Sequence, residues 1–116
     1  MRTTPSFLDL SQATEIAGDQ AQLIELVRTF EDSLSHEWTQ LQAAFENQDG
    51  ERVQMCLHAL KGFMPLFCHP NLAQAMVDLY QMSREQPFEA TQARFRVLDP
   101  SFLALQKEVK AWLGAL

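Results

Sequence analysis

The chain has 116 residues, of which 47% are apolar, so a single domain over residues 1–116 can bury a hydrophobic core without disulfides or metals. Its 15 acidic and 9 basic side chains give a formal net charge of −6, which argues against nucleic acid or an anionic membrane as a partner. No apolar run approaches the roughly 20 residues of a membrane span, and the N-terminal segment lacks the apolar core of a signal peptide, so we expect a cytoplasmic protein.

The first predicted elements are helices, because apolar residues recur with a helical period almost throughout the chain and no segment alternates as a strand would. Residues 7–17 predict a short helix that covers one end of the fold. Over residues 18–47 an apolar residue recurs every three or four positions, which predicts one long amphipathic helix with Asp19 as its N-cap. Its buried stripe is expected to contain Leu23, Val27, Phe30, Leu34, Trp38, Leu41 and Phe45.

Two shorter helices are predicted next. The polar segment NQDGE ends the long helix, and a second stripe follows it. Pro65 lies inside this second helix and is expected to kink it, because proline removes a hydrogen bond to the carbonyl of Lys61. Pro70 then cannot continue the helix, and Asn71 can cap the third one. The expected stripes are Val53, Leu57, Leu60, Met64 and Phe67, then Leu72, Ala75, Met76, Leu79 and Met82.

The last predicted helix lies in LDPSFLALQKEVKAWLGAL, where Asp99 can cap, Pro100 suits the first helical position and Gly114 suits the exit. The segment before it, REQPFEATQARFRV, has no clear period. Its packing residues are expected to be Phe88, Phe95 and Val97, and those of the last helix Phe102, Leu105, Val109, Trp112 and Leu113. Four helices joined by short turns predict an all-α antiparallel four-helix bundle, with a short additional N-terminal helix.

The segment MCLHALKGFMPLF contains polar residues that a buried helix would not need. At about 100° per residue, His58 points roughly 140° from the centre of the second stripe, so we expect it to face solvent. Gly62 and Pro65 share that outer face, and Met55 and Leu66 lie beside them. An exposed apolar surface of low relief is typical of a site where another protein binds.

The residues around His58 suit the transfer of a negatively charged group. A neutral imidazole is a good nucleophile near pH 7, and phosphoryl is the obvious group for it to accept. Lys61 is three positions further along the helix and can offset part of the phosphoryl charge. Gly62, which costs about 1 kcal/mol of helix stability relative to alanine, would leave room for the phosphoryl oxygens and for the partner. The rest of such an active site would come from the partner.

HALKG, at residues 58–62, resembles the H-x-x-K-G motif of histidine-containing phosphotransfer (HPt) domains, four-helix modules that carry phosphoryl groups between receiver domains. The resemblance extends over about residues 16–84, through GDQAQLIELVRTFEDSLSHEWTQLQAAFENQDGERV before the motif and NLAQAMVDLYQMSR after it. It implies that His58 is the phosphoacceptor, that Lys61 steadies the phosphoryl group and that Gly62 makes room for it.

The same resemblance implies a monomeric phosphocarrier of a two-component phosphorelay, and not an enzyme that completes the chemistry alone. Its partners would be response-regulator receiver domains and a hybrid sensor histidine kinase, which would dock on Met55, Pro65 and Leu66. The chain would need no cofactor or metal of its own, because the receiver supplies the aspartate and the Mg²⁺.

A second interpretation is an adaptor or inhibitor that docks a receiver or a histidine kinase through the same face without accepting phosphate. The family usually has small residues after the glycine and another glycine six positions beyond it, whereas this chain has Phe63, Met64 and Cys68. Pro65 is also unusual for the family. A third interpretation is a purely structural helical domain, which does not explain why an exposed His58 lies beside Gly62.

The two cysteines, Cys56 and Cys68, are too few for the disulfide framework of a secreted protein and are typical of a reducing compartment. With His58 and His69 they suggest a zinc site. However, Cys56 and His58 are two apart on a helix and point about 160° from each other, so they cannot share an ion. We expect His36 and His69 to be ordinary surface or turn residues.

Overall fold

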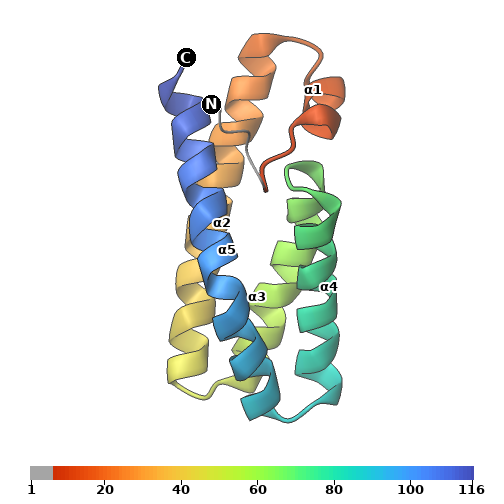
Figure 1. Cartoon of the computed structure of the whole chain (residues 1–116), viewed down its shortest axis with the longest axis vertical. Coiled ribbons are helices and arrows are strands. Elements are labelled where there is room, and N and C mark those ends of the chain that lie inside the picture. Colours follow the sequence, from red (N-terminus) through yellow and green to blue (C-terminus); the bar gives the residue numbers. More distant parts are fainter. Residues whose placement is uncertain (1–6) are drawn as a thin grey trace, which may run out of the picture.

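The computed structural model describes residues 7–116, and over that range the chain is all-helical, with no β-strand. Its elements are α1 (Ser11–Ala17), α2 (Gln20–Glu46), α3 (Gly50–Phe63), a 3-10 helix η1 (Met64–Leu66), α4 (Pro70–Glu85) and α5 (Phe88–Gly114). The chain reverses direction between successive long helices, and the last part of α5 lies beside the first part of α2 (Figure 1). None of the described helices combines the length and the apolar character needed to cross a membrane.

The long helix α2 follows its predicted pattern. Asp19 is the N-cap, and its carboxylate accepts a hydrogen bond of 2.8 Å from the backbone N–H of Gln22. Asp49 caps α3 in the same way through the N–H of Arg52. The apolar stripe of α2 is buried as predicted, at Leu23, Val27, Phe30, Leu34, Trp38, Leu41 and Phe45.

Stacked aromatic rings hold α2 to its neighbours. Trp38 lies with its ring centroid 3.4 Å from that of Phe102, which joins the middle of α2 to α5. Phe45 stacks on Phe95 at 4.6 Å about two turns further along the same pair of helices. Nearer the start of α2, Phe30 stacks on Phe67, the residue after η1, at 4.2 Å. The core is therefore continuous from α5 through α2 to the end of α3.

The predicted second helix ends sooner than its apolar stripe. The α-helix stops at Phe63, and Met64–Leu66 form a 3-10 turn that contains Pro65. Because Pro65 has no backbone N–H, the α-helical ladder cannot continue through it, and the N–H groups of Phe67 and Cys68 both donate to the carbonyl of Met64. Pro65 was expected to kink a continuing helix, whereas the α-helix ends before it; the stripe Val53, Leu57, Leu60, Met64 and Phe67 is buried as predicted.

The N-terminal helix is shorter than predicted, because helix α1 begins at Ser11 and residues 7–10 are not helical. Leu8 pairs with Cys68 as an isolated antiparallel bridge, and the N–H of Asp9 donates to the carbonyl of Phe67 at 2.8 Å. The carboxylate of Glu108, on α5, accepts from the backbone N–H groups of Phe7 and Leu8. These distant partners pair with the N–H groups of Phe7, Leu8 and Asp9, in place of the helical hydrogen bonds that the local sequence predicts.

The predicted cap of the third helix is wrong. Asn71 lies inside α4, whose N-cap is His69 and whose first residue is Pro70. The Nδ1 atom of His69 accepts a hydrogen bond of 3.1 Å from the N–H of Asn71. The expected stripe is largely present, with Leu72, Met76 and Leu79 buried, whereas Ala73 is buried in place of the half-buried Ala75.

The predicted start of the last helix at Asp99 and Pro100 is also wrong, because α5 runs without a break from Phe88 to Gly114. Burial of Phe95 and Leu98 before the proline, and of Phe102 after it, outweighs the roughly 3 kcal/mol that a proline inside a helix costs. Pro100 and Arg96 are both exposed, so water can reach the carbonyl that loses its helical donor. Val97, which was expected to pack, is 63% exposed.

We predict that Glu108→Ala lowers the free energy of unfolding by about 1 to 3 kcal/mol, because it leaves the N–H groups of Phe7 and Leu8 without their acceptor. Glu108→Gln keeps a side-chain oxygen and is expected to lose less. Urea unfolding measures both changes, with Glu25→Ala, at an exposed position of α2, as the control. An equal midpoint for Glu108→Ala and the control would show that residues 7–10 do not depend on this carboxylate.

Candidate functional site

His58 lies on the outer face of α3 and is exposed, as predicted. Its neighbours in the sequence, Cys56 and Leu57, are buried, and Leu60 is completely buried half a turn further on. These side chains fix the rotation of α3 against α2 and α4. The imidazole is therefore presented to solvent by a helix that cannot turn without exposing its core residues.

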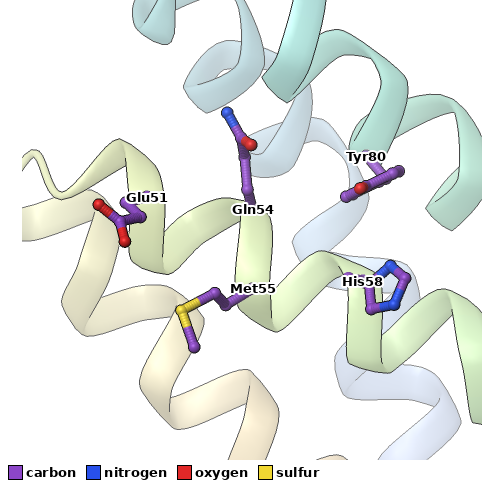
Figure 2. Close-up of a pocket in the computed structure, with 5 residues that line it drawn as sticks. All are labelled: Glu51, Gln54, Met55, His58 and Tyr80. Atoms are coloured by element: carbon purple, nitrogen blue, oxygen red, sulfur yellow. The ribbon is translucent and has the colours of Figure 1, made fainter.

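An open hollow of about 300 Å³ lies between α3 and α4 and has His58 on its wall. It is lined by Glu51, Gln54, Met55, His58 and Tyr80 (Figure 2). Met55 is 58% exposed, which makes it one of the most exposed large apolar side chains among residues 7–116. The amide of Gln54 donates to the backbone carbonyl of Ser83 at 3.1 Å and ties α3 to α4 beside the hollow.

The ring of Tyr80, on α4, joins the histidine to two cationic side chains. The centroids of the His58 and Tyr80 rings are 5.5 Å apart, and the ring planes are tilted by 51°. The Nζ atom of Lys61 lies 5.1 Å from the Tyr80 centroid, and the guanidinium carbon of Arg84 lies 5.8 Å from it. Both distances are within the range in which a cation is attracted to an aromatic face.

Gly62 is exposed and faces open space. A Cβ atom built at this position meets no heavy atom within 4 Å outside its own helix and chain neighbours. Its φ angle lies in the ordinary helical range, so the backbone does not need glycine here. The glycine leaves a gap one turn beyond His58, and neither backbone strain nor tight packing explains it.

The bulky residues that follow Gly62 point inward. Phe63 is half-buried and meets the ring of Phe30, on α2, edge to face at 5.9 Å, and Met64 is completely buried. Pro65 and Leu66 are half-buried, and Leu66 packs against the core. Of the three apolar residues expected on the docking surface, Met55 is thus exposed, and Pro65 and Leu66 are only half-exposed.

The cysteines are buried thiols. Burial raises the pKa of the Cys56 thiol to about 11 and that of Cys68 to about 12, so both stay protonated at neutral pH. Cys56 is 2% exposed whereas His58 is exposed, and no group of three metal-binding side chains occurs among residues 7–116. His36 lies on the surface of α2, and His69 caps α4.

Sequence reasoning missed Tyr80 and Arg84. In the sequence, Tyr80 directly follows the stripe residue Leu79 and so lies at the edge of the buried face. This position indicates only weakly that the tyrosine side chain is partly exposed. Only the rotation of α4 against α3 brings its ring to His58. That rotation is a property of the packed structure, and no local sequence signal carries it.

Comparisons of the chain with family models, with curated proteins and with solved structures found no match. The candidate site therefore rests on its own geometry: an exposed histidine, an adjacent lysine and an open glycine position on one helix, with a tyrosine and an arginine on the next.

We predict that Gly62→Ala stabilises the protein by about 0.5 to 1 kcal/mol, since alanine is the better helix former and the added methyl group meets no neighbour. Thermal unfolding measures the change. Gly18→Ala is a contrasting control, because Gly18 has a φ of 81° and a side chain there is strained. A lower midpoint for Gly62→Ala would mean that this face of α3 packs against something.

Proposed function

We propose that this protein is a histidine phosphotransfer protein of a multistep two-component phosphorelay. His58 would accept a phosphoryl group from the aspartate of one receiver domain and pass it to another receiver. The observation that carries the proposal is the combination, on one exposed face of α3, of a solvent-facing imidazole, the Lys61 side chain and the open space at Gly62. The H-x-x-K-G resemblance supports the same function.

The proposed fold class is an antiparallel four-helix bundle formed by α2, α3, α4 and α5, with α1 as the additional helix. In support of it, α2 packs against α3 and α5, and α4 packs against α3 and α5, so the four helices close a ring of contacts around the core. This arrangement leaves the outer face of α3 free for a partner.

The proposed transfer forms a bond from phosphorus to one imidazole nitrogen. That nitrogen attacks with its lone pair, the bond from phosphorus to the aspartyl oxygen breaks, and the aspartate keeps the bonding electrons as a free carboxylate. The other ring nitrogen retains its proton, so the product is a phosphoimidazolium on His58. The Lys61 ammonium offsets part of the charge of the phosphoryl oxygens.

The proposed partner surface surrounds His58 on α3 and η1. Met55 lies on one side of the imidazole, and Gly62, Pro65 and Leu66 lie on the other. The receiver would bring the aspartate and the Mg²⁺, so the phosphocarrier itself would need no metal. Receiver domains and a hybrid sensor histidine kinase are the partners that this proposal names.

We predict that His58→Gln abolishes phosphoryl acceptance and leaves the fold intact, because the imidazole is exposed and adds little to packing. The assay mixes each variant with a phosphorylated receiver and Mg²⁺ and measures acid-labile, base-stable phosphate on the protein. His36→Gln, at an exposed position of α2, is the matched control and should be labelled like the unmodified chain.

Label that persists in His58→Gln would contradict the assignment of the phosphoacceptor. An unmodified chain that binds the receiver but takes no label would instead be an adaptor or inhibitor that uses the same helix face. A chain that neither binds nor takes label would rule out both functions.

We predict that Gly62→Gln slows transfer by about tenfold or more, because its side chain would fill the space one turn from His58 where the receiver must approach. Gly62→Ala is expected to lose less. Gly114→Gln, at another glycine with no atom within 4 Å of an added Cβ, is the control for the loss of a glycine. If Gly62→Gln transferred phosphate at the rate of the unmodified chain, the receiver would not need the space beside Gly62, and the prediction would be wrong.

A further inference from the structure

Tyr80 stands out because three polar side chains converge on one half-buried ring. His58 and Lys61 reach it from α3, and Arg84 reaches it from the next turn of α4. Figure 2 shows the ring above the imidazole, on the α4 side of the hollow. A tyrosine that served only to fill space would not need to meet the histidine and both cations.

The position of this ring is fixed by its own helix. Leu79 and Met76 are completely buried, so α4 cannot rotate, and the Gln54 amide ties the backbone of Ser83 to α3. The ring is therefore a rigid surface against which the longer and more flexible Lys61 side chain can rest. The imidazole, whose ring is tilted by 51° against it, has part of its rotamer space occupied by Tyr80.

The two cations meet the ring and not a carboxylate. Among residues 7–116, neither Lys61 nor Arg84 lies within ion-pair distance of an acidic side chain, although the chain has 15 acidic residues against 9 basic ones. A cation held by an aromatic face keeps its full charge for an incoming anion. An ion pair with a carboxylate would first have to be broken.

We propose that Tyr80 is a positioning residue for phosphoryl transfer, an inference that rests on the proposed role of His58. The ring restricts the imidazole to orientations that keep a nitrogen open to the receiver. It also holds the Lys61 ammonium within reach of the phosphoryl group before that group arrives. When phosphorus bonds to His58, Lys61 leaves the ring for the phosphoryl oxygens, and it returns when the group departs.

The test compares Tyr80→Phe, which keeps the ring, with Tyr80→Met, which removes it while retaining a good helix former. Val77→Ala, an exposed position one turn earlier on α4, is the control. Transfer from a phosphorylated receiver is measured over a range of receiver concentrations. We expect Tyr80→Met to lower the saturating rate by about tenfold, with the half-saturating concentration unchanged and Tyr80→Phe close to the unmodified protein.

A second readout needs no transfer. Proton NMR should show the Lys61 side-chain methylene signals shifted upfield by the aromatic ring in the unmodified chain and in Tyr80→Phe, and unshifted in Tyr80→Met. A change confined to the half-saturating concentration would make Tyr80 a docking contact and overturn the positioning role. Loss of transfer in Tyr80→Phe as well would overturn it too, since the ring alone should suffice.

The failure of this inference is distinguishable from that of the proposed function. If the unmodified chain takes no phosphate, the phosphorelay function fails and the role of Tyr80 fails with it. If the unmodified chain and Tyr80→Met transfer equally well, only the role of Tyr80 fails. Circular dichroism checks the fold, with Tyr80→Leu as a second ringless variant. Unfolding of both ringless variants would make Tyr80 a core residue and overturn the inference.

Discussion

The burial of one face of α3 is the constraint on which the rest of the site depends. Val53, Leu57 and Leu60 are buried, and each such side chain contributes about 1.5 to 3 kcal/mol when it leaves water. A rotation of α3 by one residue would expose all of them at once. The direction of the His58 side chain is therefore set by apolar residues that take no part in the proposed phosphoryl transfer. The site is rigid because the core beneath it is rigid.

The same constraint explains why bulky residues can follow Gly62 without filling the space beside the histidine. Phe63 turns toward Phe30 on α2, and Met64 completes the inner stripe, so their volume lies inside the fold. The α-helix ends just before Pro65. Beyond it, the Phe67 carbonyl accepts from the N–H of Asp9 and the His69 N–H donates to the carbonyl of Phe7. The residues that set this segment apart from the family pattern thus act on the interior and on the end of α3. The exposed face at His58, Lys61 and Gly62 is left unchanged.

Periodic local patterns were predictable from the sequence, and features that depend on distant partners were not. The stripe of α2, the Asp19 cap and the exposure of His58 follow from residues a few positions apart, so the sequence alone predicts them. The backbone pairing of Phe7 and Leu8 depends on Glu108, about a hundred positions away, and no local rule predicts it. The predicted start of the last helix was wrong for a related reason. Proline does favour the first position of a helix, but the burial of core residues on both sides of Pro100 outweighs that local preference. Tyr80 was missed because the contact of its ring with His58 depends on how α4 is rotated against α3.

The acidic character of the chain does not conflict with the phosphoryl transfer proposed for His58. At physiological ionic strength, exposed charges separated by more than about 8 Å are largely screened, so an approaching phosphoryl group responds mainly to the nearest side chains. Near His58 these are Lys61 and Arg84 on the Tyr80 ring. Glu51, at the other end of the hollow, is two helical turns away, about 10 Å along the axis of α3. The two cations thus lie beside Tyr80, at the end of the hollow where the imidazole is, and Glu51 lies at the other end.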